Sequence, residues 1–141
     1  MPTYHLAQLN VALPVAPLDD PVMAGFMGGL AELNALADRS PGFVWRLVDA
    51  DGQDATGLRL SDDTMVNMSV WESLEALRSY VYRSPHLESL RRRREWFRHA
   101  DGPYTVLWWV QAGHLPTLAE GEQRLARLVA GGPGPDAFTF R

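Results

Sequence analysis

Three segments of this chain alternate as β-strands do, yet they carry large apolar side chains on both sides. Segment 104–111 has Tyr104, Val106, Trp108 and Val110 on one side and Leu107 and Trp109 on the other; segment 64–71 sets Val66, Met68 and Val70 against Trp71; segment 42–49 sets Phe43, Trp45 and Leu47 against Val44 and Val48. Successive side chains of a strand point to opposite faces of a sheet. A sheet built from these segments must therefore be shielded from water on both faces, because monomers rarely expose an apolar patch of that size.

The order of the strand-like and helix-like segments predicts the fold class. Helical spacing occurs at 21–38, 73–82, 84–97 and 115–132, and strand alternation also occurs at 3–12. The resulting β-α-β-β-α-β order is that of an α+β, ferredoxin-like fold, an antiparallel sheet with helices on one face. We expect one domain over 1–141, with a core at 1–114 and a C-terminal helix and tail at 115–141. A second copy of the chain is the simplest cover for the other face, so we expect a homodimer.

Composition excludes several classes of protein. The net charge is −4, from 13 basic residues, all of them arginine, and 17 acidic residues. A chain with an acidic surplus is not typical of nucleic-acid binders. There is no cysteine, so disulfides and thiolate metal sites are excluded. No apolar run reaches the length of a membrane span, and the N-terminus lacks the features of a signal peptide. We therefore expect a cytoplasmic protein that binds neither nucleic acid nor membranes.

The run of four arginines at 91–94 lies in the predicted helix 84–97. Four consecutive residues sweep most of the circumference of a helix and cannot form one basic face. If the helix is continuous, Arg94 shares its buried side with Leu90 and Phe97, whereas Trp96 points away. A buried guanidinium needs a partner. That partner is either an acidic side chain or an anionic or carbonyl-bearing ligand, and the sequence leaves both open.

His86 is the histidine best placed to take part in chemistry. It falls in the first turn of its helical segment, where the helix dipole disfavours a protonated ring. A neutral imidazole beside a pocket can act as a base, a hydrogen-bond donor or an axial ligand; the alternative is a purely structural histidine. The spacing of the histidines does not match a metal site, so we expect no metal centre.

Polar residues interrupt the strands at a few positions that could face a pocket. These are Gln8, Asn10, Asn67 and Ser69, and the aromatic residues Trp71, Tyr80, Tyr82 and Trp108 could complete the same pocket. The alternative is that they are core and dimer contacts.

The chain resembles a bacterial family of unknown function in the dimeric α+β barrel superfamily. The resemblance extends over YHLAQLN (4–10), NALADRSPGFVWRL (34–47), VNMSVWESLEALRSYVYRSPH (66–86), LRRRREWF (90–97), LWWVQAGHLPT (107–117) and AFTFR (137–141). The superfamily includes antibiotic-biosynthesis monooxygenases and haem-degrading monooxygenases. The haem-degrading members resemble one another in an asparagine, a tryptophan and a histidine. Asn10 of this chain matches the asparagine, but Tyr80 stands at the position of the tryptophan and Leu90 at the position of the histidine.

The resemblance implies a small-molecule enzyme of monooxygenase-like type, with a hydrophobic or aromatic substrate between sheet and helices. Cofactor-free members hold such a substrate with Asn, Trp and Tyr side chains and let it react with oxygen directly. On this reading the catalytic residues are His86, Arg94 and Asn10, the substrate-binding residues are Tyr80, Trp71, Asn67 and Trp108, and no cofactor is needed. Two alternatives stay open: a non-catalytic ligand-binding or structural homodimer, and a haem-binding protein that uses His86.

Overall fold

The computed structural model describes residues 3–50, 52, 54–60, 64–100 and 102–140. Four strands form one antiparallel sheet in the order β2-β3-β1-β4: β1 (Tyr4–Ala12), β2 (Phe43–Arg46), β3 (Met65–Trp71) and β4 (Thr105–Gln111). The long central strands pair Asn10 with both Asn67 and Thr105. This is the ferredoxin-like arrangement, so the predicted α+β fold class is confirmed.

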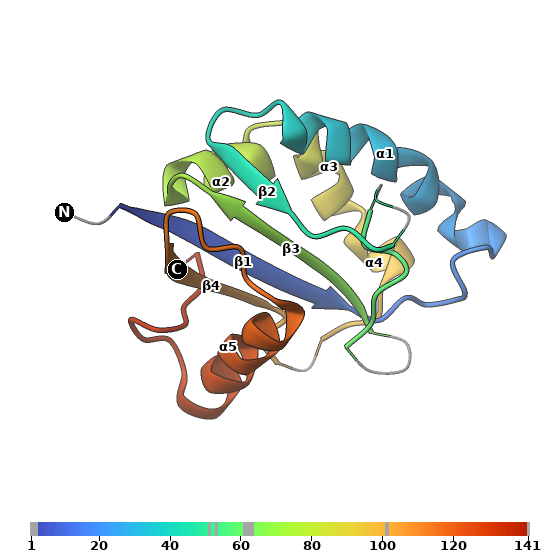
Figure 1. Ribbon diagram of the computed structural model, residues 1–141. Helices are drawn as coiled ribbons and strands as arrows, with labels where there is room; N and C mark the ends of the chain where they lie inside the picture. The colour runs from blue at the N-terminus through green and yellow to red at the C-terminus, as the bar shows by residue number, and fades with distance from the viewer. Residues whose placement is uncertain (1–2, 51, 53, 61–63, 101, 141) are drawn as a thin grey trace.

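Most helices gather on one side of the sheet (Figure 1). They are η1 (Pro21–Met23), α1 (Ala24–Asp38), α2 (Leu74–Tyr82), α3 (His86–Arg91) and α4 (Arg93–Trp96). Ser73 caps α2 by accepting a hydrogen bond from the backbone N–H of Ala76 at 3.1 Å. On this side Leu6, Ala37, Trp71, Leu77 and Leu107 form a buried cluster. In the part of the chain that the structure describes, no helix is both long and apolar enough to cross a membrane.

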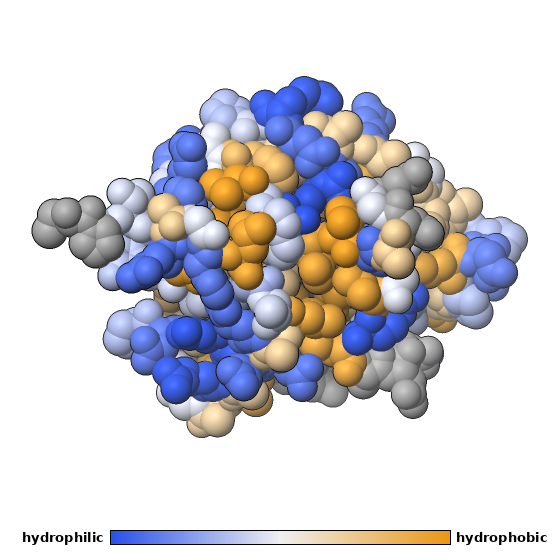
Figure 2. All heavy atoms as spheres, in the orientation of Figure 1, coloured by the Kyte–Doolittle hydropathy of each residue, from blue (hydrophilic) through white to orange (hydrophobic). Residues whose placement is uncertain are grey.

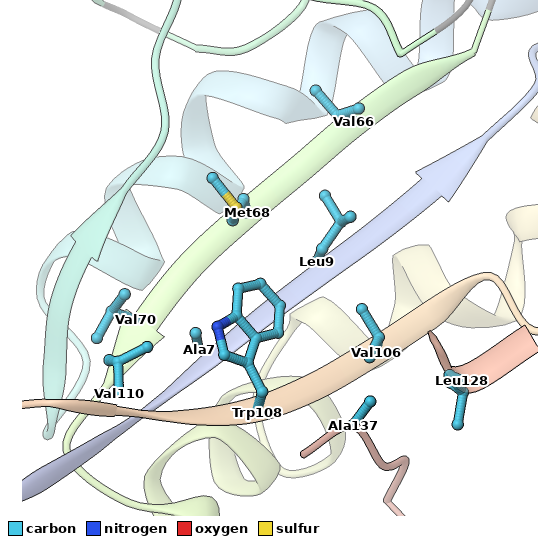
Figure 3. Close-up of a cluster of buried hydrophobic side chains, with 10 residues drawn as sticks. All are labelled: Ala7, Leu9, Val66, Met68, Val70, Val106, Trp108, Val110, Leu128 and Ala137. Carbon is cyan, nitrogen blue, oxygen red and sulfur yellow. The ribbon is translucent and has the colours of Figure 1, made fainter. Parts of the chain in front are cut away.

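The last helix, α5 (Leu118–Gly131), packs on the opposite face of the sheet (Figure 1). Figure 3 shows the cluster beneath it, which joins side chains of β1, β3 and β4 to Leu128 of α5 and to Ala137: Ala7, Leu9, Val66, Met68, Val70, Val106, Trp108 and Val110 complete it. The approach is close, because a Cβ on Gly121 would lie 3.1 Å from the Met68 sulfur and 3.2 Å from a Leu9 methyl. Any larger residue at this position would require the Met68 and Leu9 side chains to shift.

The α5 helix covers part of the sheet face that we expected a second copy of the chain to cover. It covers the buried cluster, while apolar side chains of β2 and the loop after it are only half-buried: Val44, Trp45, Leu47, Leu58 and Leu60. Figure 2 shows hydrophobic surface on this face between β2 and α5. The second face is therefore closed by the chain itself at one side and left apolar at the other.

A bulge in β2 changes which of its side chains face the helices. The pairing with β3 shifts register between Phe43 and Trp45. As a result Phe43 and Arg46 face the helices, while Val44 and Trp45 pack against the α5-side cluster. The strict alternation expected for this segment is wrong here, because one extra residue reverses the parity of the strand.

A carboxylate fastens α5 to the sheet. The indole N–H of buried Trp108 donates to Glu120 Oε2 at 2.8 Å, and His114 Nε2 lies 2.6 Å from Glu120 Oε1. Replacing Glu120 by alanine leaves the Trp108 N–H without its acceptor, which costs about 1–3 kcal/mol for a buried donor. We therefore expect Glu120→Ala to lower the free energy of unfolding by that amount in urea denaturation, and exposed Glu122→Gln to leave it unchanged. Equal midpoints for the two variants would contradict the assigned role.

Candidate functional site

A cavity of about 630 Å³ lies between the sheet and the helices α1 to α4. Its floor is made by the helix-facing side chains of β1 and β3, and its roof by apolar and aromatic side chains of the helices. The roof residues include Phe26, Leu30 and Leu33 of α1, Tyr80 of α2, His86 and Leu90 of α3, and Trp96 of α4. A cavity of this size is typical of small-molecule sites.

The floor carries a row of polar side chains in place of the apolar residues found on the α5 side. The side-chain amide of Gln8 donates to Asn67 Oδ1 and to Ser69 Oγ, both at 2.8 Å. The indole N–H of Trp71 also donates to Ser69 Oγ at 2.8 Å. Gln8 and Ser69 are 6% and 7% exposed, so this network is held rigidly, whereas Asn67 is exposed and marks an open side of the cavity. A fixed amide floor can hold ligand oxygens in one orientation.

Tyr80 and His86 form the polar part of the roof. The Tyr80 ring stacks on Trp71 with centroids 5.1 Å apart, and the His86 ring lies 4.8 Å from the Tyr80 ring. The Tyr80 hydroxyl donates to the backbone carbonyl of Leu33 at 3.0 Å. This bond fixes the ring between α1 and α2 and leaves the hydroxyl oxygen able to accept a further hydrogen bond.

Burial keeps both of these groups uncharged at neutral pH. It raises the pKa of Tyr80 to about 12, with Arg46 opposing the shift and Asp38 adding to it. Burial also lowers the pKa of His86. The backbone carbonyl of Val81 favours the protonated ring and opposes this shift. His86 Nδ1 is buried and makes no hydrogen bond within the described residues. The roof thus holds a neutral imidazole, which is the form of the ring that can accept a proton.

The structure brings together five of the seven residues predicted for the site. Asn10, Asn67, Trp71, Tyr80 and His86 all line the cavity. Trp108 does not: it pairs with Ala7 and lies in the cluster under α5, on the opposite face of the sheet. The prediction of Trp108 as a substrate contact is wrong in its placement, because alternation along β4 sets it on the same side as Val106 and Val110.

Arg94 is also misplaced by the sequence reading. The predicted single helix breaks at Arg92, with φ −89° and ψ 3°, and continues as the separate short helix α4. The break shifts the helical phase, so Arg94 is exposed and Arg93 turns into the cavity wall. Trp96, expected to point away, is 4% exposed and lines the cavity as well.

Two further residues of the site escaped the sequence reading. Arg46 lines the cavity beside the floor and forms an ion pair with Asp38 at the end of α1, with Arg46 Nε 2.8 Å from Asp38 Oδ1. The β2 bulge that turns Arg46 inward leaves no local signal in the sequence. Phe140 of the C-terminal segment closes another part of the wall, where its backbone carbonyl accepts a hydrogen bond from Arg78.

The side chains present do not fit a haem-degrading site. Leu90 lines the cavity at the position where that pattern requires a histidine, and leucine has no donor atom for iron. Tyr80, at the position of the tryptophan, has its hydroxyl engaged with Leu33. Among the residues that the structure describes, no group of three or more His, Asp or Glu side chains is arranged to hold a metal ion.

Comparisons with known proteins identify the family and the fold. The model of a family described as a domain of unknown function (DUF3291) matches residues 5–141, and the chain belongs to this family. No curated protein matches the chain. A solved structure of NE2512, a protein of unknown function from Nitrosomonas europaea, is 12% identical with a TM-score of 0.51, over 83% of this chain and 99% of that one. It confirms the predicted fold.

Two oxygenases are also among the similar structures. SnoaB, a cofactor-independent oxygenase from Streptomyces nogalater, is 21% identical with a TM-score of 0.44, over 82% of this chain and 98% of that one. A monooxygenase from the gene ActVA-Orf6 of Streptomyces coelicolor, in complex with nanaomycin D, is 18% identical with a TM-score of 0.39, over 82% and 94%.

The lowered pKa of His86 predicts a specific dependence of stability on pH. Between the lowered pKa and the ordinary value of 6.5, the unfolded chain binds more protons at this residue than the folded chain does. The free energy of unfolding therefore rises with pH through this window and falls as the pH drops below about 6.5. In His86→Gln this contribution should vanish. The free energy of unfolding, measured by urea denaturation at several pH values, should therefore fall less steeply with decreasing pH in the variant than in the wild type.

The exposed residue His99 provides the control for this measurement. His99→Gln should follow the wild-type pH profile. Parallel profiles for wild type and His86→Gln would contradict the burial of His86.

Proposed function

We propose that this member of the DUF3291 family binds a hydrophobic or aromatic small molecule in the cavity and acts on it as a cofactor-independent, monooxygenase-like enzyme. The observation that carries the proposal is the cavity itself: Asn10, Asn67, Tyr80 and His86 surround one open space of about 630 Å³. An accessory protein without a ligand would have these positions tightly packed. A flat aromatic molecule fits a space with an amide floor and an aromatic roof.

The residues support a reaction in which the substrate supplies the electrons that reduce oxygen. The neutral His86 imidazole accepts a proton from an acidic C–H group next to a phenol or carbonyl of the substrate. The carbanion then reacts with O₂, and the resulting hydroperoxide loses water. A CH₂ group and O₂ thus become C=O and H₂O, which balances without a further reductant. Asn10 and Asn67 hold the substrate oxygens, and the Tyr80 hydroxyl oxygen accepts a hydrogen bond from a substrate hydroxyl.

Oxygen consumption with a set of anthrones and naphthols, which carry the required CH₂ group in their keto forms, tests this proposal. Wild-type protein should consume oxygen with at least one of them, and His86→Gln should lower kcat by about 100-fold, the usual contribution of a general base. His99→Gln, a change of the same kind on an exposed side chain, should keep full activity. Equal rates for wild type and His86→Gln would remove His86 from the reaction. Binding without any oxygen consumption would favour the non-catalytic alternative.

A second copy of the chain is the proposed partner. The half-buried side chains beside α5, Val44 and Leu58 among them, form apolar surface on the second face of the sheet. A second copy related by a two-fold axis would remove this surface from water. The cavity lies on the other face of the sheet, so the pairing leaves it within one subunit.

Sedimentation equilibrium tests the pairing. The wild-type protein should have about twice the 15.7 kDa mass of the chain, and Val44→Asp should shift it toward 15.7 kDa because a charge on this surface opposes association. Arg94→Gln, on the other side of the sheet, should remain paired. A wild-type mass of 15.7 kDa at micromolar concentration would contradict the dimer.

A further inference from the structure

Arg93 is the member of the arginine run that enters the cavity. It is half-buried, and it stands over aromatic rings: the guanidinium carbon lies 4.2 Å from the centroid of the Tyr104 ring and 5.4 Å from that of the Phe97 ring. The contact with Tyr104 helps to hold the guanidinium in place. Its N–H groups donate no hydrogen bond to the described residues, so they are available to an acceptor in the cavity.

Arg91 and Arg92 have acidic partners, whereas Arg93 and Arg94 have none among the described residues, and of these two only Arg93 lines the cavity. Arg91 lies 4.0 Å from Glu88, Arg92 lies 2.9 Å from Glu95, and Arg46 lies 2.8 Å from Asp38. Within the part of the chain that the structure describes, no carboxylate is within ion-pair distance of Arg93. Burial lowers the pKa of its guanidinium, which shows that the charge has lost solvation. A partly desolvated cation in a cavity wall is a ready receptor for an anion.

The position of Arg93 sets the shape of the ligand. His86 begins α3 and Arg93 begins α4, so the two side chains line different parts of the cavity roof. Tyr80 and Trp96 line the roof of the same cavity, and Trp71 lines its floor. A ligand that reaches both His86 and Arg93 therefore has an apolar ring system with an acidic group at one end.

We propose that Arg93 recognises an anionic group of the ligand and that the cavity selects aromatic carboxylic acids over their neutral analogues. This inference rests on the cavity of the proposed function and adds the substrate class. A carboxylate takes two parallel N–H···O hydrogen bonds from the guanidinium edge, while the ring system extends beneath Trp96 toward Tyr80. A carboxamide of the same shape has one acceptor oxygen and no charge, and it binds less tightly.

A matched pair of ligands tests the proposal directly. The dissociation constants of 2-naphthoate and 2-naphthamide are measured by isothermal titration calorimetry at neutral pH. Wild-type protein should bind the acid at least about tenfold more tightly than the amide, the smaller effect expected for hydrogen bonds to a charged group. Equal affinities for the two would overturn the proposal without need of any variant.

A pair of adjacent variants assigns the preference to one residue. Arg93→Gln should bring the affinity for the acid down to that for the amide and leave the amide nearly unchanged. Arg94→Gln makes the same change in net charge at an exposed position outside the cavity, and it should keep the preference. Loss of the preference for the acid in both variants would mean that it arises from the overall charge of the protein. An equal loss of affinity for the acid and the amide in Arg93→Gln would mean that Arg93 only packs against the ligand. Either result overturns the proposal.

The binding assay is independent of the proposed reaction. Acid preference without oxygen consumption supports the role of Arg93 and removes the oxygenase reaction. Oxygen consumption with neutral aromatic compounds, together with equal affinity for acid and amide, supports the oxygenase reaction and removes the role of Arg93.

Discussion

The covering of both faces of one four-stranded sheet by helices governs the rest of the structure. Helices α1 to α4 cover one face, and α5 covers part of the other, fastened through Glu120 to the indole of Trp108. The two covers differ in kind. Under α5 the packing leaves little room beside Gly121, whereas beneath the other helices the buried cluster around Trp71 and Leu77 gives way to a cavity. One face of the sheet is closely packed beneath α5, and the other encloses a cavity.

The cavity exists because polar side chains occupy strand positions that an ordinary core would fill with apolar ones. Gln8, Asn67, Ser69 and Trp71 satisfy one another through hydrogen bonds, so the floor has no unsatisfied groups to drive its collapse onto the helices. The opposite holds for His86 Nδ1 in the roof, which has no protein partner among the described residues. Each such buried group costs free energy.

The sequence predicted the fold well, because strand alternation and helix spacing are local properties. The strand and helix boundaries agree with those expected to within a few residues, and Asn10, Asn67, Trp71, Tyr80 and His86 meet as expected. The errors arise where one local irregularity changes the phase of an element. The break at Arg92 exchanges Arg94 for Arg93, and the bulge in β2 turns Arg46 toward the cavity. The position of α5 depends on long-range packing around Gly121, which no spacing within the helix itself reveals.

The five tryptophans allow the division between the two faces to be tested in one experiment. Trp71 and Trp96 line the cavity, and Trp108 lies in the dry cluster beneath α5. The indole N–H resonances of the ¹⁵N-labelled protein can be followed by NMR as an aromatic ligand such as 2-naphthol or 2-naphthoate is added. The structure predicts that the signals of Trp71 and Trp96 shift and that the signal of Trp108 stays in place. A shift of Trp108 with Trp71 and Trp96 unchanged would contradict the assignment of the cavity to the face that carries Trp71 and Trp96.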